Sequence, residues 1–348
     1  MVHIPIPDLL RLLVLPVFAW AAWRDVQTRR VSNATWYPLA ALAVVLLLTE
    51  SWVAWSGPPF SREWMGLQVA VSEWYFFYIA VSLGFVAPLV LAFWWFRAFG
   101  GADAKAFLVI AALLPTYPFY HFGGTVFPVQ GTVLGVFSLT ILTNAVLLAA
   151  LYPLALFVRN LIAGRFDSVM FVGRVVPWNE IPDSHGRLLE TPDGTSRNGA
   201  DLDAIRMYLR WRGVSLAALR KRASELRDPT TLPAEPNPPT DGAVGAKSIG
   251  SKTVTDGGKV VEKSRESNDS SYEDPWGAAR FLAEIDHGAY GTTPTQLREG
   301  LEVLVAEDEV WVSPGIPFIV PMFAGLLVAF GYGDLLSGLL GALGIVAI

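Results

Sequence analysis

Asp25 and Asp103 are the two residues of this sequence whose type and position best suit joint chemistry. Each follows a long apolar run. A charged side chain at the edge of a membrane segment is energetically unfavourable, so its presence there indicates a functional role. Two carboxyl groups in contact can share one proton, since like charges at short range do not both ionise readily. The ionised partner can then take a proton from water while the protonated partner polarises a carbonyl group. The pair is therefore a candidate acid–base dyad for hydrolysis.

The neighbours of Asp103 are compatible with a specialised site. The stretch FGGADAK contains Gly100 and Gly101, which allow a sharp bend and bring a peptide group or another helix close to the carboxylate. Lys105 could tune the pKa of the pair, contact a lipid phosphate or extend from a helix end to water. On this segment alone, a plain polar loop between two membrane helices explains the residues equally well. The second acid, Asp25 in the similar context WRDVQTRRVSN, favours the functional interpretation.

Together, these two motifs resemble those of the prepilin peptidases, a family of GxGD-type membrane aspartic proteases, and in particular its archaeal prepilin and preflagellin peptidase branch. The resemblance rests on Asp25 followed by VSN at 31–33 and on GGAD at 100–103. It implies that Asp25 and Asp103 are the catalytic pair. It also implies that the substrates are precursors of type IV pilin-like proteins, prepilins or prearchaellins, which carry short basic leader peptides. We expect no cofactor.

The resemblance has two departures and a limited extent. Ser32 stands where many bacterial members carry proline, and Ala102 replaces the second glycine of the strict motif. Neither departure changes a catalytic residue type. The similar parts are the membrane segments at about 9–158 and 310–334, not the large insert between them. We expect residues 311–318 (WVSPGIPF) to re-enter the membrane, because the family's last membrane segment opens with a similar proline-and-phenylalanine pattern.

The composition indicates a polytopic membrane protein. Hydrophobic residues make up 53% of the 348 residues and charged residues only 16%, and the apolar residues form long runs. The absence of cysteine excludes disulfides and thiolate metal sites. Most charged residues, and the excess of acids behind the net charge of −5, lie in 159–309. We therefore expect this segment to be water-soluble.

The sequence predicts an all-α fold with about six transmembrane helices. Arginines directly after the first helix place its end in the cytoplasm, and counting crossings then puts Asp25 and Asp103 on the same, cytoplasmic face of the cell membrane. Arg11 and Pro16 lie inside the first helix, so its outer end is expected to snorkel or to thin the membrane. The predicted spans are about 9–23, 35–55, 69–96, 104–120, 132–158 and 310–330, with a re-entrant or peripheral tail at 335–348.

The predicted organisation has three parts. A membrane catalytic part at 1–158 precedes a cytoplasmic insert at 159–309, and a C-terminal membrane part at 310–348 follows. Residues 229–274 are rich in Pro, Gly, Ser, Thr and charge, which predicts a disordered linker within the insert.

The sequence predicts helices in the rest of the insert. The pattern in residues 201–228 predicts one or two helices with a break near Gly213, and Asp201 lies at the start of the first. Two shorter helices are expected at 275–285 and 294–306, the second capped by Thr293 or Thr295. The basic cluster RKR at 220–222 is typical of a solvated helix face; anionic lipid is a further candidate partner. We expect no nucleic-acid partner.

Asp334 competes with Asp103, because GYGD at 331–334 matches GxGD more literally. Topology argues against it, since the last helix carries Asp334 to the opposite face from Asp25. Metallopeptidase chemistry lacks ligands, because the histidines are scattered and form no HExxH pattern; they are His3, His121, His185 and His287.

Two other classes of protein use membrane carboxylates. A transporter or proton-relay protein would place its acids near the middle of the bilayer and often shows internal repeats. Here both acids lie at predicted helix ends, and no repeat relates the two halves. A presenilin-like protease would pair GxGD with a Tyr-Asp sequence, which does not occur in this chain.

Overall fold

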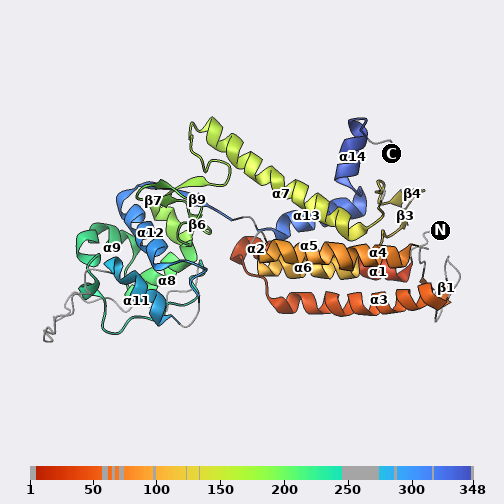
Figure 1. Ribbon diagram of the computed structural model, residues 1–348, viewed down its shortest axis with the longest axis horizontal. Coiled ribbons are helices and arrows are strands. Elements are labelled where there is room, and N and C mark those ends of the chain that lie inside the picture. The colour runs from red at the N-terminus through yellow and green to blue at the C-terminus, as the bar shows by residue number, and fades with distance from the viewer. Residues whose placement is uncertain are drawn as a thin grey trace. The chain divides into compact units, whose positions relative to one another are not determined.

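The computed structural model describes residues 5–56, 62–64, 67–69, 74–96, 99–122, 124–132, 134–244, 274–285, 288–315 and 317–345, and most of these residues are helical (Figure 1). The chain divides into two compact units. Unit 1 comprises Met1–Tyr152 and Ile316–Ile348, and unit 2 comprises Pro153–Gly315. The end of the chain therefore belongs to the same unit as its beginning.

Unit 1 is a helical bundle in which α2, α3, α5 and α6 lie alongside one another, whereas α14 stands nearly perpendicular to them and α7 continues into unit 2 (Figure 1). Helices α3 and α5 pack against α6, and α13 from the end of the chain packs against α2. The helices are α1 (Ile6–Arg11), α2 (Val14–Thr28), the 3-10 helix η1 (Asn33–Trp36), α3 (Tyr37–Ser56), α4 (Tyr75–Val81), the π-helical η2 (Ser82–Val86), α5 (Ala87–Trp95), α6 (Gly101–Leu113), α7 (Phe137–Ile162), α13 (Ile319–Gly331) and α14 (Leu335–Ala342). Two antiparallel strand pairs join them: β1 (Arg62–Trp64) with β2 (Leu67–Val69), and β3 (Tyr120–Phe122) with β4 (Thr125–Phe127).

Four helical segments among the described residues are long and apolar enough to cross a membrane. They are Ile6–Thr28, Asn33–Ser56, Tyr75–Trp95 and Phe137–Ile162. The chain is thus a membrane protein, but six spans are not established. Helix α13 is apolar but shorter, and α6 has 13 residues, about 20 Å at 1.5 Å per residue. That is less than the roughly 30 Å hydrocarbon core of a typical bilayer.

The bounds of several helices differ from the sequence-based expectation. The first span continues through Thr28, so Asp25 lies within α2 and not in the loop after it. The fourth helix ends at Leu113 and not near Tyr120. Pro115 explains this early end, because proline lacks the N–H that a helix needs and disfavours helical geometry in the residue before it.

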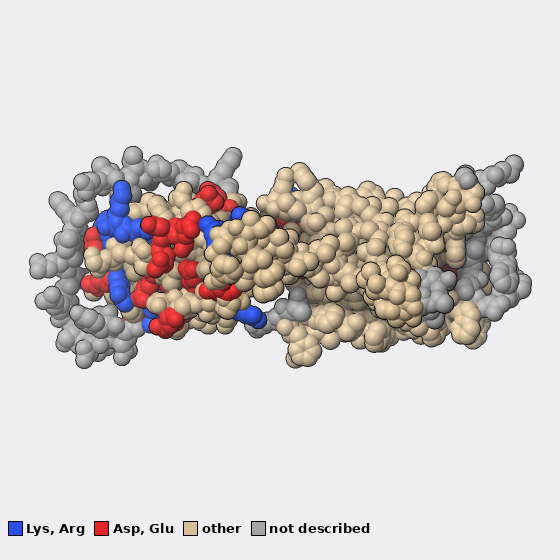
Figure 2. All heavy atoms as spheres, turned by 90° about the horizontal axis from the view of Figure 1, so that it is seen from above, with Lys and Arg blue, Asp and Glu red and all other residues tan. Residues whose placement is uncertain are grey.

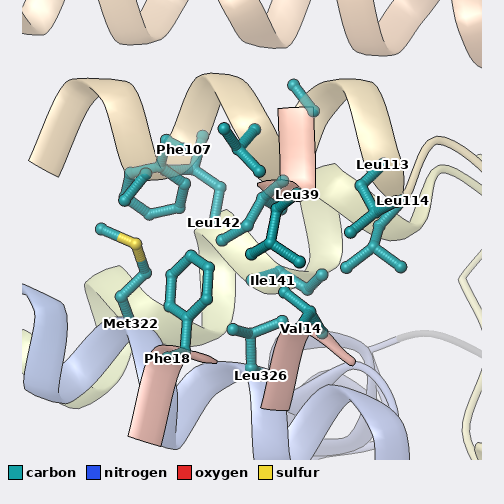
Figure 3. Packing of buried hydrophobic residues seen from close by; sticks show 14 of the residues in the cluster. Val14, Phe18, Leu39, Phe107, Leu113, Leu114, Ile141, Leu142, Met322 and Leu326 are labelled. Carbon is teal, nitrogen blue, oxygen red and sulfur yellow. The ribbon is translucent and has the colours of Figure 1, made fainter. Parts of the chain in front are cut away.

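Side chains from α2, α3, α6, α7 and α13 form one buried core in unit 1. In Figure 3, Phe18 and Met322 lie near Phe107, and Ile141 lies in the same packed layer. Lipid tails are as apolar as these side chains, so close packing holds such a bundle together more than transfer out of water does. Gly325 illustrates this, because a Cβ there would lie 2.8 Å from the backbone nitrogen of Ala145 in α7.

Arg11 is buried in unit 1, so it does not support snorkelling, one of the two expectations for the outer end of the first helix. Its guanidinium group donates to Asp8 and to Glu50, each at 2.7 Å, and its Nε donates to the Leu113 carbonyl oxygen at 3.0 Å. All three charged residues are buried. Arg11 and its two partners therefore join α1 to α3 and to the C-terminal end of α6. Because each charge is paired inside the bundle, the guanidinium group need not extend to the membrane surface.

Unit 2 has a small antiparallel sheet, which the all-α expectation missed. Its order is β5 (Arg174–Pro177), β9 (Glu309–Ser313) and β6 (Arg187–Leu188). Val310 and Val312 of β9 are buried and alternate with more exposed residues, as expected for a half-buried strand. Residues 311–313 therefore form the central strand of this sheet, which corrects their predicted entry into the membrane. A further strand pair joins β7 (Glu190–Thr191) to β8 (Gly194–Thr195).

The helices expected in unit 2 are present, although residues 201–228 form three helices and not one or two, and the sequence did not predict the 3-10 helices at Trp178–Asp183 and Pro229–Thr231. Gly213 ends α8 in a left-handed conformation with φ 74°, and Asp201 caps its start by accepting from the Asp203 N–H. Thr293 caps α12 through the Gln296 N–H. The helices are η3 (Trp178–Asp183), α8 (Leu202–Arg212), α9 (Leu216–Lys221), α10 (Ala223–Leu226), η4 (Pro229–Thr231), η5 (Pro275–Gly277), α11 (Ala278–Glu284) and α12 (Pro294–Ala306).

The expected linker at 229–274 begins with packed residues. Arg206 donates to the Gly242 carbonyl oxygen at 2.6 Å, and Tyr290 donates to the Asp241 carbonyl oxygen at 2.7 Å. Leu232 packs against the core of unit 2. Residues 245–273, on which the rest of that prediction falls, lie outside the described residues.

Charge separates the two units. On the face shown in Figure 2, acidic and basic side chains cover unit 2, whereas the visible face of unit 1 is almost free of them. Unit 1 exposes large apolar side chains, for example Trp55 and Trp95, which are 84% and 78% exposed. Such a surface is expected where lipid is the solvent.

Candidate active site

Asp25 lies in the last turn of α2 and is buried. Its carboxyl group accepts a hydrogen bond from the backbone N–H of Ile319, the first residue of α13. The positive charge of Arg29 also acts on it. Arg29 ends α2 in a left-handed conformation with φ 53°, and its N–H donates to the Asp25 carbonyl oxygen at 2.9 Å. A helix N-terminus and a cation thus both face this carboxyl group.

Asp103 lies in the first turn of α6. Its Oδ2 accepts a hydrogen bond from the Gly100 N–H at 3.1 Å. Gly100 is the N-cap residue of α6, so the side chain of Asp103 accepts a hydrogen bond from the backbone of the residue that begins its own helix. This bond fixes the carboxyl group at the end of the bundle where α6 begins.

The structure places Asp25 and Asp103 close enough for the charge of Asp25 to act on the carboxyl group of Asp103. They come from different helices, α2 and α6, and are 78 positions apart in the sequence. Asp103 is partly exposed, whereas Asp25 is buried. The pair therefore combines a carboxyl group held inside the bundle with one that solvent or a peptide can reach.

Gly100 and Gly101 differ in what their missing side chains would contact. A Cβ at Gly100 would lie 2.8 Å from Oδ2 of Asp103, closer than side-chain atoms tolerate. A Cβ at Gly101 would lie 3.8 Å from Nε1 of Trp94, an ordinary contact. Gly100 is thus the glycine that makes room for the carboxyl group of Asp103.

Lys105 does not extend freely from its helix. Its Nζ donates to Oδ1 of Asn33 at 2.8 Å. Asn33 begins η1 and belongs to the VSN stretch that follows Asp25. Lys105 therefore connects the two motifs that the sequence singled out.

An aromatic cluster near the start of α6 was not predicted from the sequence. Phe99 stacks on Phe107 with ring centroids 5.5 Å apart, and Phe318 lies 4.8 Å from Phe99. Phe318 immediately precedes α13. The cluster packs the start of α13 against the start of α6, and the signal for it was the proline-and-phenylalanine pattern at 314–318.

Asp334 lies in a different environment. It is the N-cap of α14, and its Oδ1 accepts from the Ser337 N–H at 2.6 Å. Its Oδ2 accepts from Oγ1 of Thr140 at 3.0 Å. One carboxylate oxygen of Asp334 therefore caps α14, and the other connects the turn after α13 to α7. Within the part of the chain that the structure describes, no three His, Asp or Glu side chains are grouped as a metal site requires.

Comparisons with known families cover both parts of the site. Residues 12–154 match the model of the type IV leader peptidase family, and residues 249–335 match the model described as archaeal peptidase A24 C-terminus type II. The first match includes Asp25 and Asp103, and the second includes Ile319. No curated protein matches the chain significantly. The two family matches, together with a helical membrane bundle that joins their residues, show that this chain belongs to the archaeal prepilin peptidase family.

Proposed function

We propose that the chain is an aspartic endopeptidase in which Asp25 and Asp103 form the acid–base pair. The feature that supports this most directly is the location of the two carboxyl groups on α2 and α6 within electrostatic range of each other. The two family models describe peptidases but assign no residues. Asp334 is a poor alternative, since both of its oxygens are used to fix a turn.

The contacts of the two carboxyl groups suggest which one acts as the base. Asp25 faces the charge of Arg29 and the N–H of Ile319, and both favour an ionised carboxylate. Asp103 is the more accessible of the two and carries the shared proton. In this mechanism, Asp25 takes a proton from a water molecule, the resulting hydroxide attacks the scissile carbonyl carbon, and Asp103 donates its proton to the carbonyl oxygen. As the C–N bond of the tetrahedral intermediate breaks, Asp25 gives its proton to the leaving amine and Asp103 takes a proton from a hydroxyl group of the intermediate, which restores the pair to its starting state.

The substrates in this proposal are type IV pilin-like precursors, prepilins or prearchaellins, with short basic leaders. A site at the end of the helical bundle suits such a precursor, because its apolar helix can lie in the bilayer beside α2 while the leader stays in water. In the same proposal α6 and α13 are short additional spans, which gives six crossings. The pair and unit 2 then face the cytoplasm.

The test is cleavage of a basic-leader precursor in membranes that contain Asp25→Asn, Asp103→Asn, the double variant or Asp334→Asn. Each single Asp variant of the pair should lose about 10²–10⁴-fold in rate, because the amide can neither hold the shared proton nor accept one from water. The double variant should be no worse than either single variant, because the pair acts as a unit. Asp334→Asn should retain activity. Full cleavage by a folded Asp103→Asn protein would rule out this mechanism.

A further inference from the structure

The helix η1 contacts both helices that carry the acidic pair. Its last residue, Trp36, is buried against Phe18 of α2, with ring centroids 5.1 Å apart. Its first residue, Asn33, accepts the hydrogen bond of Lys105 from α6 at 2.8 Å. The four residues of η1 therefore bridge α2 to α6 at the end of the bundle where Asp25 and Asp103 lie.

The geometry points to Lys105 and Asn33 as a positioning pair that sets the distance between the carboxyl groups of Asp25 and Asp103. This inference rests on the proposed function of that acidic pair. Lys105 follows Asp103 by two residues, about 200° around the helix axis. The two side chains thus leave opposite sides of α6, and a tie to Lys105 fixes the rotation of α6 that presents Asp103 to Asp25.

Asn33 is itself held in place, which makes it suitable as an anchor. Ser32 caps η1 by accepting from the Ala34 N–H, and the Thr35 N–H donates to the Ser32 carbonyl oxygen at 3.1 Å. The chain reaches Ser32 from Asp25 through the turn at Arg29. A change in the Lys105–Asn33 contact is therefore transmitted to a segment that begins at Asp25.

A positioning role and a purely structural role predict different results. The Lys105–Asn33 bond is exposed, and an exposed hydrogen bond adds little to the stability of a folded protein. Misplacement of a catalytic group by about 1 Å can reduce a rate by about 100-fold. Loss of the bond should consequently leave the protein folded while it lowers the rate of cleavage.

The test uses the full chain in membranes, with Lys105→Met, Asn33→Leu, their double variant and Lys105→Arg. Lys105→Met keeps the length of the side chain without the donor, and Asn33→Leu keeps its size without the acceptor. We expect each to lower kcat by about 10–100-fold with little change in KM. The double variant should be no slower than the slower single variant, because both remove the same contact. Lys105→Arg, which can still donate to Asn33, should recover most of the rate.

The pH profile of cleavage provides a readout that a structural role would not change. The distance between two carboxyl groups sets how strongly their titrations are coupled. A looser pair is coupled more weakly, so the acidic and basic limbs of the profile should move closer together in Lys105→Met. Lys221→Met is the matched control, because it removes an ammonium group from an exposed position in unit 2. It should have the rate and profile of the unchanged protein.

Several outcomes would overturn the inference, and they differ from failure of the proposed function. Additive losses in the double variant, or an unchanged pH profile, would show that Lys105 and Asn33 do not act through their contact. Loss of folded protein without loss of rate per folded molecule would assign them a structural role. A loss in Lys105→Met alone that depends on anionic lipid would assign Lys105 to a lipid phosphate. If Asp25→Asn and Asp103→Asn are inactive in the same experiments, the proposed catalytic role of the acidic pair holds even when the inference about Lys105 and Asn33 fails.

Discussion

The Gly100 N–H donates to Oδ2 of Asp103 at 3.1 Å, and a methyl group on Gly100 would lie 2.8 Å from the same oxygen. The bond and the space for it thus depend on one residue. The atom that would be displaced is the end of a flexible side chain, so the chain can fold around a methyl group by moving the carboxyl group. The expected cost falls on the position of Asp103 and not on the stability of the bundle.

Gly100→Ala should therefore lower the rate of cleavage by about 10–100-fold, because the carboxyl group of Asp103 moves by a fraction of an ångström or more. Its unfolding temperature in detergent should stay close to that of the unchanged protein. Gly101→Ala is the matched control, since its methyl group meets only Trp94 at an ordinary contact distance. Equal activity of the two alanine variants would contradict this account of Gly100.

Arg11 should be the residue of the bundle whose loss costs most stability without affecting the chemistry. Arg11→Met leaves Asp8 and Glu50 buried without their partner, and breaking a buried ion pair in this way costs about 3–5 kcal/mol. The group lies against Leu113, at the opposite end of α6 from Asp103. We expect a large fall in unfolding temperature, with unchanged activity per folded molecule.

The control for this prediction is Arg227→Met in unit 2. Arg227 pairs with Glu302 at 2.7 Å, but its side chain is 57% exposed, and surface pairs contribute about 0–1 kcal/mol. Its unfolding temperature should change little. A comparable loss in the two variants would show that the buried charges do not stabilise the bundle.

The sequence identified the family, and it singled out Asp25 and Asp103 as candidates, because both inferences depend on local patterns. Asp25 and Asp103 lie in short motifs, and the family resemblance built on those motifs is confirmed by the family models. Apolar runs likewise predicted most helices of unit 1. The start of α8 at Asp201 and its end at Gly213 followed from capping and left-handed preferences of single residues.

The features that the sequence did not reveal depend on contacts between distant residues. Nothing near Asp25 indicates that the N–H of Ile319 binds it, because a backbone donor carries no sequence signal. The sequence does not reveal that Arg11 is paired, since its partner Glu50 is 39 positions away. The sequence of strand β9 predicts membrane entry, because five residues of mixed polarity suit either structure until their partners β5 and β6 are known.

Asp201 should make the stability of unit 2 depend on pH. Burial raises the pKa of Asp201 to about 6, above its usual value near 3.8. The folded chain therefore binds a proton at Asp201 more tightly than the unfolded chain does. The protonated carboxyl group contributes to stability fully below pH 3.8, and this contribution is lost as the pH rises through 6. Asp201→Asn keeps an acceptor for the α8 cap but cannot ionise. Calorimetry of the full chain should show a higher unfolding temperature for this variant at pH 7.5, with little gain at pH 4.5.

Asp228→Asn provides a control of opposite sign. Asp228 caps η4 at the surface, and the Thr230 N–H lowers the pKa of its carboxyl group. Its contribution to stability is therefore present at neutral pH and is lost as the pH falls through its folded-state pKa. The asparagine variant should be slightly less stable at pH 7.5. A loss of stability in Asp201→Asn at both pH values would contradict the role of burial at that site.

Single cysteines in this cysteine-free chain should report the orientation proposed for the site. The excess of arginine at Arg24, Arg29 and Arg30 predicts a cytoplasmic end for α2. A cysteine at Gln27 should therefore react with an impermeant maleimide in inverted membrane vesicles and not in sealed right-side-out cells. A cysteine at Asp193 in unit 2 should behave in the same way if the chain crosses four times between them.

A cysteine at Thr125 provides the opposite expectation. It lies in the β3–β4 pair, which follows the C-terminal end of α6 and is free of lysine and arginine. This position should react in sealed cells and be protected in inverted vesicles. Labelling of Gln27 and Asp193 from opposite faces would show an odd number of crossings between them. In that case α6 would not span the bilayer, and Asp103 would have to meet Asp25 from a helix that enters and leaves on the same side.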